Sequence, residues 1–185
     1  MIPVGYLAKR VVQHPDWLNA PAVKDIYSVS NCISENFMDY IKFWRHNGYW
    51  LFDTPQIIRE LALENQVRLD ILTFFYYEAY KQELDEDSQQ WLDFKPEQFA
   101  THVIPPTQRA FHGYDVLTFS VGTIPECSPL SCNHLASKIK TNSHCLLESF
   151  EEAKKDLESG KFAPSEPGPF RIYAVYTVHP DDWHK

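Results

Sequence analysis

Three of the chain's four cysteines and two of its eight histidines lie between Pro125 and Cys145, in the stretch PECSPLSCNHLASKIKTNSHC. Thiol and imidazole groups at this density can bind a metal ion, form a nucleophile with its base, or fill space in the core. Each alternative requires a different arrangement of the side chains, which the surrounding strands and helices must provide.

The metal alternative is a zinc site whose four ligands are Cys127, Cys132, Cys145 and His134. Structural zinc sites are tetrahedral and use four such groups. The spacer of four residues between Cys127 and Cys132 is permitted, although two residues are more usual. His144 is an alternative fourth ligand, but on a strand its side chain would point away from that of Cys145.

The catalytic alternative makes Cys132 the nucleophile of a thiol-dependent enzyme. The SPLS sequence before it indicates the start of a helix over residues 132–139. A cysteine in a first helical turn is favoured as a thiolate by unpaired amides and the helix dipole. A base must then lie within hydrogen-bonding distance. We assign His144 to that role, with Asp115 or Glu126 as the carboxylate that orients it.

The simplest interpretation, which we prefer, is that these cysteines are core residues. Free cysteine is among the most buried residue types and behaves as a small hydrophobic side chain. On this interpretation Cys145, Leu146 and Leu147 line a buried strand, and Cys132 packs beneath its helix. The cysteines would then have no chemical role.

Alternating apolar residues predict strands over residues 3–12, 24–34, 113–122 and 170–178. Residues 68–84 are ambiguous, because their aromatic residues favour a strand whereas the spacing of Leu72, Tyr76 and Tyr80 also permits a helix. We predict a strand over 71–80, since adjacent aromatic residues suit a sheet that is covered on both faces.

About four helices are expected. Thr54 and Ser149 are N-caps of two of them, the first followed by a proline and the second by the glutamate of a capping box. A third helix would begin at Ser34, bury Phe37, Ile41 and Trp44, and stop at His46–Gly48; the fourth is the one over 132–139. Residues 85–110 are predicted to be mostly irregular, because prolines interrupt them.

The order of these elements predicts an α+β fold over residues 1–185: a single domain with a mainly antiparallel sheet and about four helices packed on at least one face. Residues 163–169 are expected to form a loop rich in proline and glycine, and residues 179–185 a surface tail.

The net charge of −8 disfavours contact with nucleic acid or an anionic membrane surface, because both carry dense negative charge. A basic protein partner or a small ligand is compatible with it. No window approaches the roughly 18 apolar residues of a membrane span, and the N-terminus lacks the layout of a signal peptide. We therefore expect a cytoplasmic protein, in which cysteines are free thiols or ligands.

The chain contains none of the common phosphate-binding, dinucleotide-binding, esterase or zinc-protease motifs. We expect no cofactor, and the preferred function is a non-catalytic binding module for a protein partner or small ligand. The first alternative is the thiol enzyme with Cys132 as nucleophile, and the second is the zinc-binding protein. Thiol reactivity and metal content distinguish the three.

Overall fold

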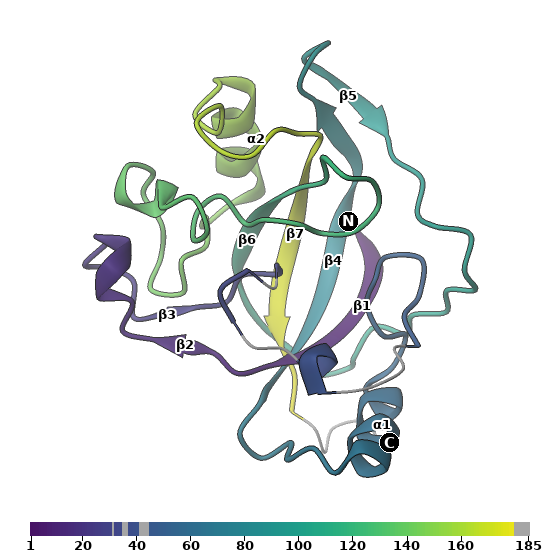
Figure 1. The fold of residues 1–185 in the computed structure, drawn as a ribbon. Coiled ribbons are helices and arrows are strands. Elements are labelled where there is room, and N and C mark those ends of the chain that lie inside the picture. Colours follow the sequence, from purple (N-terminus) through teal and green to yellow (C-terminus); the bar gives the residue numbers. More distant parts are fainter. Residues whose placement is uncertain (31, 35–36, 41–44, 180–185) are drawn as a thin grey trace.

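An antiparallel sheet forms the centre of the protein (Figure 1). The computed structural model describes residues 1–30, 32–34, 37–40 and 45–179. Across the sheet the strands follow the order β1 (Ile2–Lys9), β4 (Thr73–Asp85), β7 (Phe170–Thr177) and β6 (Ala110–Thr118). A further strand, β5 (Gln90–Asp93), pairs with the C-terminal end of β4. Two short strands, β2 (Val12–Gln13) and β3 (Asp25–Ile26), form a separate pair.

The ambiguous aromatic run belongs to β4, so the prediction of a strand over 71–80 is confirmed. Its four adjacent aromatic residues, Phe74 to Tyr77, are at most 3% exposed. A helix would turn part of this run towards solvent. A strand with β1 and β7 at its two edges, covered on both faces, buries every ring, which explains why strand propensity prevails.

Two hydrophobic clusters pack against this sheet. The first joins α1 (Pro55–Asn65), through Ile58 and Leu61, to aromatic residues of β1 and β4. The second joins α2 (Phe150–Glu158), through Ala153 and Leu157, to β6, β7 and the cysteine-rich stretch. Figure 1 shows the two helices at opposite ends of the sheet. Both clusters share one sheet, so the described chain forms a single domain.

Both α-helices begin at the predicted caps. The Thr54 side chain accepts a hydrogen bond from the Ile57 amide at 3.4 Å, and the Ser149 side chain accepts one from the Glu152 amide at 3.1 Å. Each bond satisfies an amide that has no partner within its own helix.

Replacing Ser149 with alanine is expected to lower the free energy of unfolding by about 1 kcal/mol, because the Glu152 amide loses its acceptor. Ser149→Asp, which keeps an acceptor at the cap, should remain close to wild type. Urea unfolding followed by circular dichroism measures both variants, and equal stability of the alanine and aspartate variants would contradict the role of this cap.

The expected number of about four helices is wrong: the described residues contain two α-helices, and the fold is dominated by sheet. Residues 132–139 form only a short 3-10 helix, η3 (Leu135–Ser137). The cause is His134, whose φ of 58° places it in the left-handed region and interrupts α-helical hydrogen bonding. No helix among the described residues is long and apolar enough to cross a membrane.

The helix predicted from Ser34 lies partly outside the described residues, which omit Ile41 and Trp44. Within the described part, the segment contains a 3-10 helix, η2 (Phe37–Tyr40). A further 3-10 helix, η1 (Asp16–Leu18), lies between β2 and β3. Of the predicted tail, residues 180–185 are likewise not described.

Two strand predictions also need correction. The strand expected over 24–34 is limited to β3, because the residues that follow it bond to buried side chains instead of a neighbouring strand. The stretch 85–110 contains β5, which sequence reasoning missed. The Asp85 carboxylate accepts a hydrogen bond from the Ser88 amide at 2.8 Å, and the resulting turn reverses the chain into a hairpin.

Candidate functional site

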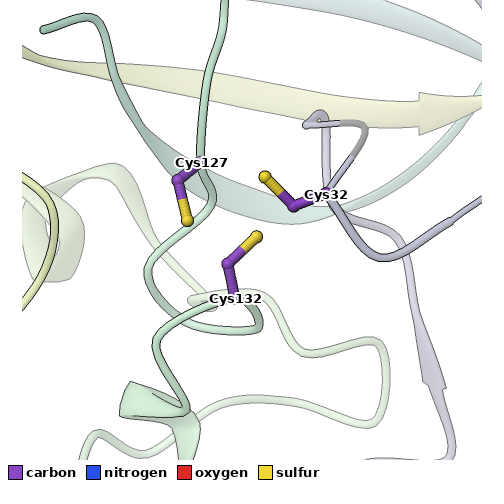
Figure 2. Close-up of side chains that lie close together, drawn as sticks. All are labelled: Cys32, Cys127 and Cys132. Atoms are coloured by element: carbon purple, nitrogen blue, oxygen red, sulfur yellow. The ribbon is translucent and has the colours of Figure 1, made fainter.

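Three cysteine sulfurs converge at one side of the sheet, as Figure 2 shows. The Sγ atoms of Cys32, Cys127 and Cys132 all lie within 4.8 Å of one another. Cys32 follows β3, whereas the other two follow β6, so the fold joins distant parts of the chain. Cys127 is buried, Cys132 half-buried and Cys32 exposed. This three-sulfur cluster therefore has a closed side and a side that faces solvent.

Backbone contacts to β6 fix the turn that carries Cys127 and Cys132. The Cys127 amide donates to the Thr118 hydroxyl at 3.2 Å, and its carbonyl accepts from the Thr118 amide at 3.0 Å. The Cys132 amide donates to the carbonyl of Ser128 at 2.8 Å, which folds the chain back on itself. The two sulfurs thereby come from opposite ends of one tight turn.

A buried lysine holds the segment that precedes Cys32. Lys9, at the end of β1, is 1% exposed, and its Nζ donates to three carbonyl oxygens, those of Ser28 (2.6 Å), Val29 (3.2 Å) and Ser30 (2.5 Å). An ammonium group is costly to bury unless its three donors are satisfied, and these carbonyls satisfy them. Burial lowers the pKa of Lys9 to about 8.

Asp115, on β6, connects this segment to the cysteine turn. Its carboxylate is fully buried and accepts from the Val29 amide at 2.8 Å and from the Ser128 hydroxyl at 2.5 Å. Burial raises the pKa of Asp115 to about 7, although these two hydrogen bonds oppose the rise. Lys9 and Asp115 together fix both parts of the three-sulfur cluster.

The three thiols affect one another's ionisation. Proximity to the thiols of Cys127 and Cys132 lowers the pKa of Cys32, and proximity to the other two thiols raises the pKa of Cys127. The Cys32 thiol also lies 2.9 Å from the Glu126 carbonyl, a contact that favours the protonated form. One proton thus leaves this cluster more readily than the others. The side-chain carboxylate of Glu126, the second candidate for orienting a catalytic base, instead accepts a hydrogen bond from the Ser120 hydroxyl at 2.6 Å.

The ligands predicted from sequence are brought together only in part. Cys127 and Cys132 meet, but their third partner among the described residues is Cys32. Cys145 is 2% exposed and packs in the second hydrophobic cluster, where burial raises the pKa of its thiol. His134 lies edge-on to the Trp17 ring, with centroids 5.2 Å apart.

The residues of the catalytic alternative have different partners. His144 Nδ1 lies 2.6 Å from an Asp25 carboxylate oxygen, and its ring stacks on Tyr27 with centroids 4.3 Å apart. Asp115 bonds to the two donors described above, and Cys132 belongs to the three-sulfur cluster. The predicted base is therefore oriented by Asp25, a carboxylate that sequence reasoning did not single out.

Comparison of the chain with protein-family models, with curated proteins and with solved structures gave no match in any of the three. The function must be inferred from the chemistry of the residues themselves, and the three-sulfur cluster is the arrangement with the most definite chemistry.

Proposed function

We propose that the protein binds a thiophilic metal ion, zinc in the first instance, through Cys32, Cys127 and Cys132. The observation that supports this most directly is the convergence of three sulfurs within 4.8 Å. Zn–S bonds of about 2.3 Å in tetrahedral geometry place sulfurs about 3.8 Å apart. Small side-chain rotations are enough to bring the three sulfurs to those positions.

The donor set determines the class of metal. Three thiolates select soft and borderline ions such as zinc, cadmium or monovalent copper over magnesium or calcium, which take oxygen ligands. Because the Cys32 side of the cluster faces solvent, a fourth ligand can reach the ion from solution. Three protein ligands with an open fourth position are typical of zinc sites that bind or activate a small molecule. A metal at this site thus agrees with a role in binding a small ligand.

The buried ammonium of Lys9 favours a metal–thiolate centre. Three thiolates on a divalent ion leave a net charge of −1, which is costly in a partly buried place. The Lys9 ammonium interacts electrostatically with Cys132 and Cys32, and it offsets this charge. This proposal modifies the zinc-binding hypothesis drawn from the sequence: Cys127 and Cys132 remain ligands, and Cys32 replaces Cys145 and His134.

Protein purified under reducing conditions without chelator is expected to contain about one metal ion per chain and to give sulfur-to-metal charge-transfer absorption with cobalt or cadmium. Serine at Cys32, Cys127 or Cys132 should weaken binding by more than the roughly 10- to 100-fold that loss of an outer partner causes. Competition with a chromophoric chelator measures the affinity.

Cys145→Ser is the matched control, because it removes one thiol from the chain but none from the three-sulfur cluster. Its affinity for cadmium should equal that of the wild type. If Cys145→Ser weakens binding as much as the three cluster variants, or if none of those variants weakens it, the proposed site is wrong.

A further inference from the structure

We infer that Cys32 is a site of oxidative modification, where a hydroperoxide closes a disulfide between Cys32 and Cys132. This inference concerns the same sulfurs as the proposed function, but it requires no bound metal. It also predicts that oxidation releases any metal that the cluster holds.

Exposure decides which sulfur reacts first. Cys32 is exposed, whereas Cys127 and Cys145 are 4% and 2% exposed. A hydroperoxide arriving from solvent therefore meets the Cys32 sulfur before the buried ones. Oxidation of cysteine is selective for accessible sulfurs, and a second thiol nearby converts the first product into a disulfide.

Two sulfurs lie near enough to be that second thiol, and packing favours Cys132. The Cys127 thiol donates to the side chain of Asn133 at 3.4 Å, so its partner lies within its own turn. Cys132 is half-buried, and its Sγ lies 3.4 Å from the hydroxyl of Ser30, in the segment that leads to Cys32. Its sulfur therefore already faces the Cys32 side.

Forming the bond requires the two sulfurs to approach from at most 4.8 Å to about 2.05 Å. Because Cys32 is exposed, rotation of its side chain displaces few packed neighbours. Cys132 needs to move less, and the tight turn that carries it can stay in place.

The chemistry takes place in two steps. The Cys32 thiolate attacks one oxygen of the hydroperoxide, the O–O bond breaks, and the other oxygen leaves as an alcohol, or as water from hydrogen peroxide. Cys32 is then a sulfenic acid. The Cys132 sulfur attacks it, the S–O bond breaks, and hydroxide leaves as water with the proton of the Cys132 thiol. Two thiols and one hydroperoxide give one disulfide, one alcohol and one water.

The test treats metal-free, chelated protein with a small excess of hydrogen peroxide and follows the intact mass. The expected product has lost two hydrogens and contains a Cys32–Cys132 link. Trypsin leaves Cys127 and Cys132 in one peptide, so additional cleavage after Leu130 with chymotrypsin is needed to separate them. Dimedone should trap a sulfenic acid on Cys32 in the Cys132→Ser variant.

Cys32→Ser should lose the reaction, whereas Cys145→Ser, the matched control, should react like the wild type. A link between Cys127 and Cys132, an unchanged mass, or undiminished reaction of Cys32→Ser would overturn the inference. With zinc-loaded protein, a zinc indicator should report one ion released per disulfide. Metal binding itself is measured under reducing conditions, so failure of the proposed function and failure of this inference give different results.

Discussion

Replacement of Lys9 by methionine is expected to lower the free energy of unfolding by about 3 to 5 kcal/mol. Methionine fills a similar volume but has no donors, so the carbonyl oxygens that Lys9 binds become buried without this partner. Asp115 also loses the positive charge that opposes the rise of its pKa. Urea unfolding at neutral pH, with reductant and chelator present, measures the loss.

Lys81→Met provides the control, because Lys81 is an exposed lysine on β4. Its stability should stay within about 0.5 kcal/mol of the wild type. In the folded Lys9→Met protein the affinity for cadmium should also fall, by roughly 10- to 100-fold, because the segment that carries Cys32 loses its anchor. If Lys9→Met is as stable as Lys81→Met, the three hydrogen bonds do not hold this segment.

The metal-free, reduced protein is expected to lose stability as the pH rises from about 4 to about 7, because the buried carboxyl of Asp115 ionises in this range. The pKa of this carboxyl is raised from 3.8 to about 7 by burial, so the folded state binds more protons than the unfolded state in this window. The stabilisation that protonated Asp115 provides is fully present below the pKa of the carboxyl in the unfolded state. It is lost as the pH rises through the pKa in the folded state. A shift of this size corresponds to about 4 kcal/mol.

Asp115→Asn isolates this contribution, because asparagine keeps the shape of the side chain but does not ionise. The difference in unfolding free energy between wild type and variant should therefore change across this window. His112, whose pKa is lowered by burial, acts in the opposite direction, but it is present in both proteins and cancels in the difference. Asp87→Asn, at an exposed position, should keep the wild-type slope. A flat difference for Asp115→Asn would show that this carboxyl does not titrate there.

Local sequence signals were sufficient for elements stabilised by their own residues. The alternation over 170–178 predicts β7, and the caps Thr54 and Ser149 predict the starts of both α-helices. The prediction of a strand over 24–34 was wrong because of a contact with a residue that is distant in sequence. Its carbonyl groups are bound by the ammonium of Lys9, and no pattern within the segment indicates that partner.

Only the part of the candidate site whose residues are close in sequence could be predicted. Cys127 and Cys132 are close in sequence and were identified together, whereas Cys32 meets them only because the fold closes. Its position depends on Lys9 and Asp115, two buried charges that look like ordinary surface residues in the sequence. Asp115 was identified as the orienter of a base, and the structure instead places it against Ser128 and Val29.

The position of β7 has a consequence for synthesis of the protein. It follows the other strands of the sheet along the described chain, yet it lies between β4 and β6 inside the sheet. On the ribosome, the facing edges of β4 and β6 stay unpaired until β7 emerges, and unpaired edges promote association between chains. A nascent chain stalled before Phe170 would therefore carry β1, β4 and β5 as one paired unit and β6 as a strand without its partner, and we expect such chains to depend on chaperones.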